Sequence, residues 1–310
     1  MSEYNTVTLS QDDFVPFGKR YGDSDAIYRP SVSYWSNVWR RLRHDKVAIV
    51  STAVILVVVL LAVFAPVFSP YGYETTDTAA KNLGPSAEHL FGTDSVGRDL
   101  WTRVWMGARV SLLIGLIGAI VPQIIGVILG GISGYFGGWV DNLIMRVIDV
   151  GYCIPQLIYV TFIMIYLDSG PVSIILAISI TGWMGSARTV RARIMQYKSR
   201  DFVLAARTMG AKPGHLIFKS ILPNVMGQQV VLLTSGIPTA IFTEAYLSFI
   251  GLGVKSPMTS LGQLSQLGSI SYRLYPYQLF IPSVIIGITI LAFYLLGNCM
   301  RDALDPHMVD

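Results

Sequence analysis

Residues 47–67 read VAIVSTAVILVVVLLAVFAPV, a run that contains no charged side chain. About 20 apolar residues in an α-helix cross the hydrocarbon core of a bilayer, which is about 30 Å thick, at about 1.5 Å per residue. This run therefore predicts a transmembrane helix, and the rest of the chain is built around further runs of the same kind.

Six such runs together predict an all-α polytopic membrane protein. Of the 310 residues, 52% are hydrophobic and only 14% are charged, and the charges gather in a few stretches, unlike those of a soluble globular chain. The second span carries many glycines, which permit close helix packing in lipid. The third is predicted to kink near Pro155. The predicted spans lie at about residues 47–67, 110–134, 150–167, 172–187, 228–250 and 279–300.

The segments outside the spans also carry signals. Residues 1–33 are predicted to be a flexible tail, too long and too polar for the start of a signal peptide. Residues 34–46 place aromatic residues on one helical face and cations on the other, which predicts a helix lying in the membrane interface. Because this basic patch directly precedes a span, nucleic-acid binding is not expected. A second interface helix is predicted at residues 101–108, and residues 301–310 form a short tail.

The distribution of basic residues predicts the orientation. Seventeen of the 23 Lys and Arg residues fall on segments that would share one side of the membrane with the N-terminus. Cytoplasmic loops carry such an excess. Both termini, and the basic segment 188–227, are therefore predicted to face the cytoplasm.

Residues 188–227 predict two short helices joined by a tight turn. The spacing i, i+3, i+4, i+7 defines one helical face, made of Phe202, Ala205, Ala206 and Met209. Gly210 suits the end of the first helix and Pro213 the start of the second, and Pro223 is expected to limit the second helix. The two alanines let another surface approach the backbone closely. An ordinary hairpin packed under its own membrane domain is the alternative.

The same segment resembles the Glu-Ala-Ala loop of binding-protein-dependent ABC importer permeases. The resemblance rests on Ala205-Ala206, Gly210 and Leu222-Pro223, while Leu204 occupies the position of the glutamate and Ser220 that of an isoleucine. It implies that the loop docks into an ATPase subunit, so that Ala206→Asp would uncouple ATP use from uptake. The implied coupling residues are Asp201, Ala205, Ala206, Gly210, Ala211, Lys212, Pro213, Gly214, His215, Leu222 and Pro223.

A second motif lies before the second span. Phe-Gly-Thr-Asp at residues 91–94, followed by Gly-Arg-Asp at residues 97–99, resembles the signature of the dipeptide, oligopeptide and nickel branch of these permeases, and of its C-type subunit. From the residues alone, Asp94, Arg98 and Asp99 predict a capped helix start with solvated ion pairs that mainly set geometry. The signature residues expected to be structural are Gly92, Thr93, Asp94, Gly97, Arg98 and Asp99.

Few polar groups lie inside the spans. Glu244, in a stretch that resembles the family's Glu-Ala-Xaa-Leu-Ser-Phe run, must be neutral, paired or in contact with water. It is a candidate for lining or gating a pore, and a structural hydrogen bond within the bundle is the alternative. Arg146 and Asp149 are predicted to pair. Cys153 and Cys299 are predicted to be small buried hydrophobic residues.

The sequence also limits the classes of function. It contains no P-loop and no cluster of catalytic side chains, so no enzyme activity is expected of the chain. Its four histidines lie far apart, so no metal site is predicted. An ion-coupled secondary transporter is a further alternative, with Glu244 as its one candidate residue. An integral-membrane enzyme is disfavoured.

The resemblance implies a type I ABC importer permease for peptides, with nickel or another small solute as the alternative cargo. Such a subunit forms half of a translocation pore and works by alternating access in the bacterial cytoplasmic membrane. The implied partners are a homologous second permease, two cytoplasmic ABC ATPase subunits, an extracytoplasmic substrate-binding protein and membrane lipid. ATP and magnesium are expected on the ATPase subunits, with no cofactor on this chain.

Overall fold

The computed structural model describes residues 34–304, and this part of the chain is helical without β-strands beyond one isolated bridge between Thr93 and Asp99. The predicted flexible tail at residues 1–33 and the last six residues lie outside the described part. The chain divides into Met1–Asn37 and Val38–Asp310, and the second unit is described below. The elements are α1 (Tyr34–His44), α2 (Lys46–Phe68), α3 (Leu100–Phe136), α4 (Gly138–Cys153), α5 (Gln156–Tyr166), α6 (Pro171–Lys198), α7 (Asp201–Thr208), α8 (Pro213–His215), a π-helical segment (Leu216–Ile221), α9 (Leu222–Phe249), α10 (Leu261–Ser271) and α11 (Tyr277–Leu304).

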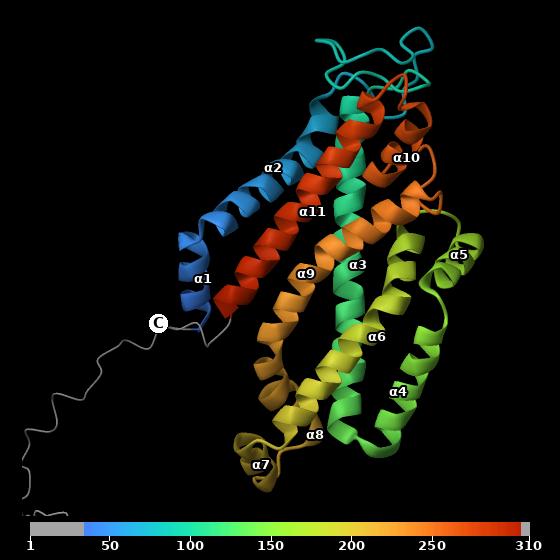
Figure 1. Ribbon diagram of the computed structural model, residues 1–310. Coiled ribbons are helices and arrows are strands. Elements are labelled where there is room, and N and C mark those ends of the chain that lie inside the picture. Colours follow the sequence, from blue (N-terminus) through green and yellow to red (C-terminus); the bar gives the residue numbers. More distant parts are fainter. Residues whose placement is uncertain (1–33, 305–310) are drawn as a thin grey trace, which may run out of the picture. The chain divides into compact units, whose positions relative to one another are not determined.

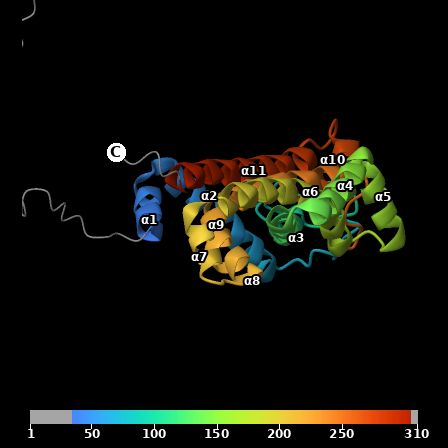
Figure 2. The ribbon, with the colours of Figure 1, turned by 90° about the horizontal axis from the view of Figure 1, so that it is seen from below.

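The long helix α3 is the centre of the bundle, in contact with α2, α4, α6 and α9 (Figures 1 and 2). Three of its glycines, one turn apart, face α6. An added Cβ would meet backbone atoms of Ala187 at Gly126 and Gly130, and the carbonyl oxygen of Arg191 at Gly134. These glycines let the two helices touch along their backbones, as the sequence predicts for the second span.

Four helical stretches in residues 34–304 are long and apolar enough to cross a membrane: α2, α3, Pro213–Phe249 and α11. A fifth is obtained if the bent pair of α4 and α5 counts as one span. The predicted fourth span is the first half of α6, whose second half carries Arg188, Arg191 and Arg193. The chain is thus a multi-pass membrane protein, and the number of six spans stays a prediction.

The predicted kink at Pro155 is a sharp bend. The helices α4 and α5 meet at 87°, and Ile154 before the proline is extended. The ring of a proline disfavours the helical conformation of the preceding residue, which accounts for the break. The helix before the bend begins at Gly138, and the start of the third span at about residue 150 stays a prediction.

Among the connecting segments, one prediction was wrong and one helix was not predicted. Residues 101–108 do not form a separate interface helix, because they are the continuous first turns of α3, and Val104 and Ala108 are fully buried in it. The connection at residues 254–278 contains a helix, α10, that was not predicted. Its start had a signal in the sequence: Ser260 accepts a hydrogen bond from the backbone of Gln263, and Ser-x-x-Gln is the pattern of a capping box.

The predicted helix at residues 34–46 is present as α1, although its place in a membrane interface stays a prediction. Arg43 lies over the ring of Trp39, 4.9 Å from its centre, and Val38 packs against Val231 and Leu304. The prediction for the cysteines was half correct. Cys299 is buried, but Cys153 lies at the bend after α4 with its side chain exposed.

Candidate functional site

The end of the bundle formed by α7 and α8 carries the segment that the sequence analysis singled out (Figure 1). We call residues 199–221 the hairpin segment. The helix α6 continues to Lys198, so the predicted loop is shorter than residues 188–227. Gly210 ends α7 with a φ of 83°. The Ala211 N–H donates to the carbonyl of Ala206 and the Gly210 N–H to that of Arg207, which together form a Schellman motif.

The inner face of the hairpin segment is packed against the bundle. Val203, Leu216 and Ile221 are buried together with Val190 and Ile194 of α6. Ala206 and Ala211 pack against the edge of the same cluster. The segment therefore has a fixed position on α6 rather than hanging as a free loop.

The outer face of the hairpin segment is open. Met209 is 81% exposed and Phe218 61% exposed, and Phe202 and Leu204 are also exposed. Ala205, Lys212, Pro213, Gly214 and His215 are exposed as well. The predicted face of α7 is therefore divided, because Ala205 points away from the cluster that Ala206 touches. In the part of the chain that the structure describes, no other segment covers these apolar side chains, and an exposed apolar patch of this kind is typical of an interaction surface.

Pro223 does not end the second helical stretch, but the regular α-helix is interrupted just before it, in line with the predicted limit. The chain passes from α8 through the π-helical segment Leu216–Ile221 straight into α9, where Pro223 occupies the first turn. The π-helical segment directly before Pro223 departs from the α-helical hydrogen-bond pattern at the point where the proline has no N–H to donate. Leu222 is half-buried and Pro223 exposed.

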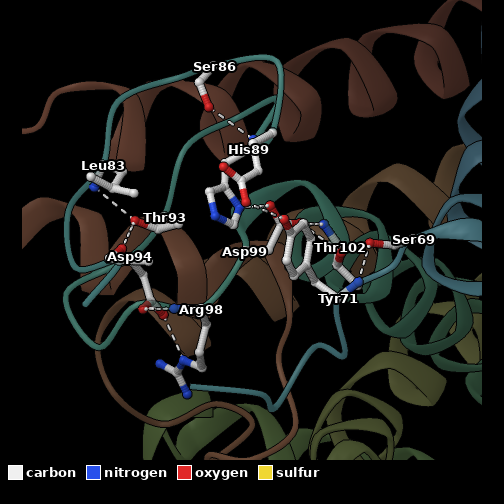
Figure 3. A network of polar contacts seen from close by, with 12 residues as sticks. Ser69, Tyr71, Leu83, Ser86, His89, Thr93, Asp94, Arg98, Asp99 and Thr102 are labelled. Atoms are coloured by element: carbon white, nitrogen blue, oxygen red, sulfur yellow. Dashed lines mark hydrogen bonds and ion pairs between the residues drawn. The ribbon is translucent and has the colours of Figure 1, made fainter. Parts of the chain in front are cut away.

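The opposite end of the bundle carries residues 69–99, which we call the signature loop (Figure 3). Asp99 caps α3, as predicted, by accepting hydrogen bonds from the backbone N–H and the hydroxyl of Thr102, at 2.8 and 2.7 Å. Its other oxygen lies 3.0 Å from Nδ1 of His89, whose ring packs on Tyr71. A hydroxyl pair, Thr102 and Ser69, connects this network to the end of α2.

The ion pairs of the signature loop are buried, whereas the sequence predicted solvated pairs. Asp94 lies 2.7 Å from Nε of Arg98 and 3.7 Å from Nε of Arg103. The Arg103 side chain is fully buried, and that of Asp94 is 12% exposed. Asp94 also accepts hydrogen bonds from the backbone of Val96 and Arg98.

The signature residues without charge hold the shape of the same loop. Gly92 and Gly97 have φ values of 76° and 82°, which residues with a Cβ rarely adopt. At Gly97 a Cβ would also collide with the backbone of Asp77. Thr93 accepts a hydrogen bond from the backbone of Leu83, and its own hydroxyl donates to Ala80.

Glu244 is fully buried between three helices. It accepts hydrogen bonds from the hydroxyls of Ser111 on α3 and Ser248 on α9, both at 2.7 Å. Ser260, at the start of α10, donates to Ser248. Sequence reasoning missed Ser111 and Ser260, since they come from distant parts of the chain, and it also missed Ser248, which lies one turn from Glu244 on α9. The geometry supports the structural alternative for Glu244, because both carboxylate oxygens are bonded inside the bundle.

A cavity of about 520 Å³ opens beside Glu244 but does not include it. We call it the central cavity. It lies halfway along α3, and its walls come from α3, α4, α5, α6 and α9. Thr243, the neighbour of Glu244, lines it. Glycines on three of these helices widen it: Gly118, Gly182, Gly185 and Gly236.

The predicted pair of Arg146 and Asp149 was wrong. Asp149 instead pairs with Arg188 of α6 at 2.5 Å, and the Arg188 guanidinium lies over the ring of Tyr152. A second pair joins the same two helices, since Arg191 donates to both oxygens of Asp141. Both arginines lie in the half of α6 that was predicted to be loop, which is why they were not considered as partners. In the described residues no group of His, Cys, Asp and Glu could hold a metal ion.

Two families match the chain. Residues 126–310 match the family described as binding-protein-dependent transport system inner membrane component. Residues 33–85 match the family described as N-terminal TM domain of oligopeptide transport permease C. Together these matches include the hairpin segment, Glu244 and the start of the signature loop.

Curated relatives match nearly the whole chain. The oligopeptide transport system permease protein OppC of Bacillus subtilis (strain 168) is 43% identical over 97% of this chain and 98% of its own length. The dipeptide transport system permease protein DppC of the same organism is 41% identical over 95% and 92%. OppC of Escherichia coli (strain K12) is 37% identical over 88% and 91%.

The fold also matches a solved structure. A chain of the MetNI methionine ABC transporter, from its inward-facing conformations in the CY5 native crystal form, superposes with a TM-score of 0.51. The match covers 66% of this chain and 94% of that chain, at 19% sequence identity. This likeness concerns the fold.

Proposed function

Because this chain belongs to the family of binding-protein-dependent transport system inner membrane components, we propose that it is the permease subunit of an ATP-driven importer of peptides. The full-length relatives named for oligopeptide and dipeptide transport support peptides as the cargo. Nickel or another small solute is the alternative, and no feature of the central cavity favours it.

The observation that carries the proposal is the open outer face of the hairpin segment. A permease without a nucleotide site must receive the energy of ATP through contact, and that contact needs a fixed yet uncovered surface. The hairpin segment meets both conditions, since Val203 and Ile221 fix it to α6 while Met209 and Phe218 stay exposed. We infer that an ATPase subunit covers this face and moves α6 and α9 with it.

The excess of Lys and Arg supports a cytoplasmic position for the hairpin segment and for both termini. In that orientation the signature loop lies outside, where a substrate-binding protein delivers cargo. The complete importer would contain this chain, a homologous second permease and two ATPase subunits that bind ATP and magnesium. ATP binding would close the ATPase pair, and the pore would open outward by alternating access.

Expression with the neighbouring genes of its operon tests the proposed assembly. The chain should purify in mild detergent together with a second permease and two ATPase subunits. Peptide-loaded binding protein should raise the ATPase rate of the complex. A stable complex that lacks any ATPase subunit would contradict the proposal.

A single substitution tests the proposed contact. Ala206→Asp, which the sequence suggests, would place a carboxylate against the chain's own buried cluster. A loss of uptake could then come from lost docking or from lost stability of the chain. Ala205→Asp is the sharper change, because Ala205 is exposed on α7. It should abolish peptide-stimulated uptake while the chain still inserts and folds. Ala192→Asp, an equally exposed change on α6 outside the hairpin segment, should leave uptake unchanged. Normal uptake by Ala205→Asp would remove the hairpin segment as the docking site.

A further inference from the structure

The central cavity is lined by apolar residues and by uncharged polar ones. Among the described residues that line it there is no Asp, Glu, Lys, Arg or His. Its polar groups are hydroxyls and amides, from Thr181, Ser235, Thr239, Thr243, Gln123 and Gln156, together with the Tyr152 hydroxyl. Asp149 and Arg188, which pair with each other beside Tyr152, are not among the lining residues, and neither is Glu244, the neighbour of Thr243. A solute in the cavity therefore meets dipoles rather than fixed charges.

Three of these hydroxyls form a line on α9. Ser235, Thr239 and Thr243 follow one another at intervals of four residues, so they lie on one face of the helix and all line the cavity. About 6 Å separates successive positions along the helix axis, at about 1.5 Å per residue.

The protons of these hydroxyls are already used. Ser235 donates to the carbonyl of Val231 at 3.1 Å, Thr239 to that of Ser235 at 3.0 Å, and Thr243 to that of Thr239 at 2.8 Å. A hydroxyl whose proton is bonded to the preceding turn keeps its lone pairs as acceptors. The oxygen of Thr239 also lies 3.5 Å from the hydroxyl of Tyr294, the longest of these contacts.

The amide of Gln123 adds a further acceptor to the same wall. Its NH2 group donates to the side-chain oxygen of Gln229, which is buried in α9. One of the two N–H groups of this amide is thus used in the helix contact, and the carbonyl oxygen can accept a hydrogen bond. The wall formed by α9 and the middle of α3 consequently offers acceptors.

We propose that the central cavity is part of the translocation path, and that Ser235, Thr239 and Thr243 accept hydrogen bonds from the N–H groups of the cargo. This inference rests on the proposed peptide import and specifies its site. An extended peptide presents N–H groups on one side about every 6.6 Å, close to the interval of the hydroxyls along α9. A backbone can therefore move past the wall while it exchanges one acceptor for the next.

The absence of fixed charge among the described lining residues favours weak binding of the cargo, and weak binding suits transport better than tight binding does. A carboxylate on this wall would hold the terminal ammonium of a peptide by a strong charge-assisted bond. Neutral acceptors hold it weakly, and conduction requires sites that let the solute leave again. The wall also does not select among the side chains of the cargo, because it binds only the N–H groups that all peptides share.

Uptake by the assembled importer in proteoliposomes tests the role of the hydroxyls, with trialanine as the probe. Thr239→Val and Thr243→Val keep the side-chain shape and remove the acceptor. Each should lower the maximal uptake rate per ATP hydrolysed by about three- to tenfold, the effect of one lost hydrogen bond. Thr234→Val is the matched control, since Thr234 donates to Val230 in the same way but packs on Gly297 of α11 outside the cavity. Equal uptake by Thr239→Val and Thr234→Val would overturn the proposal.

A labelling measurement separates the path from the cargo. In importers carrying Cys153→Ser, a thiol introduced by Thr239→Cys should react several times faster with a water-soluble maleimide than one introduced by Thr234→Cys. Equal and slow reaction would overturn the proposal, because a translocation path must admit water. Fast reaction of Thr239→Cys in an importer that does not transport trialanine would support a water-filled path and refute the peptide cargo. The failure of the path and the failure of the cargo can therefore be told apart.

Discussion

The signature loop and the hairpin segment lie at opposite ends of the bundle (Figure 1). They differ in which kind of side chain is buried and which is exposed. In the signature loop, Asp94 and Asp99 are buried and have partners in the loop and in the first turn of α3. In the hairpin segment, the apolar residues Met209 and Phe218 are exposed. One end has its polar groups enclosed, and the other has its apolar groups uncovered.

This difference separates two uses of an irregular segment. A loop whose charges are paired inside can hold its shape without a partner, and it fixes the spacing of α2 and α3 through Ser69 and Thr102. A segment with an uncovered apolar face reaches its lowest free energy only when another surface covers it. Substitutions in the signature loop should therefore lower stability, and substitutions on the outer face of the hairpin segment should affect assembly alone.

The largest effect is expected at Asp94. Asp94→Asn keeps the size of the side chain but removes the charge that faces Arg98 and the fully buried Arg103. Removing one partner of a buried ion pair typically costs about 3–5 kcal/mol, because the other charge stays buried. The thermal unfolding midpoint of the purified chain measures the loss.

The control for Asp94 is Asp168→Asn. Asp168 is exposed in the turn before α6 and has a φ of 58°, which asparagine also tolerates. This variant should unfold at the temperature of the wild type. If both variants unfold alike, the signature loop is not the self-sufficient element that its contacts indicate.

A smaller effect is expected inside the hairpin segment, and only on one of its faces. Ile221→Ala empties a fully buried position between α6 and α9, at a cost of about 2–4 kcal/mol. Phe218→Ala removes a larger side chain from the outer face and should leave the stability of the isolated chain unchanged. Chemical unfolding of both variants in detergent measures this contrast. A large loss for Phe218→Ala would mean that the outer face is packed within the chain.

The spacing of apolar residues and the positions of helix-capping and helix-ending residues predicted most of the local structure. The apolar runs located the cores of α2, α3, α9 and α11, and Gly210 ends α7 as predicted. The aspartate at position 99 caps α3, as its place before a helical pattern indicates. Each of these features depends on residues within a few positions of one another, and such features can be inferred from a single sequence.

The failures concern contacts between distant residues. The pairing of Asp149 with Arg188 depends on α4 and α6 lying side by side, which spacing along one helix cannot show. The same reason explains why the serines around Glu244 were missed, since Ser111 and Ser260 come from α3 and the start of α10. Burial of Asp94 was missed because short polar stretches of sequence are expected to be solvated. In the structure, Tyr277 and Gln278 of α11 donate hydrogen bonds to carbonyl groups of this loop and cover it.

The smallest effect is expected where α4 meets α6, and it tests how firmly these two helices are held together. The side chains of Asp149 and Arg188 are 50% and 47% exposed, so Asp149→Asn should cost no more than about 1 kcal/mol. Asp141, in contrast, is mostly buried and accepts hydrogen bonds from Ser133 and from two nitrogens of Arg191. Asp141→Asn should cost about 2 kcal/mol, because bonds to a charged group that water does not reach are stronger. Both variants remove a carboxylate that pairs α4 with an arginine of α6, and the two carboxylates differ in burial. Chemical unfolding in low and high salt therefore compares the two losses directly. Salt should reduce the small effect of Asp149→Asn and leave that of Asp141→Asn nearly unchanged. Equal losses at both sites would show that exposure does not set the strength of these pairs.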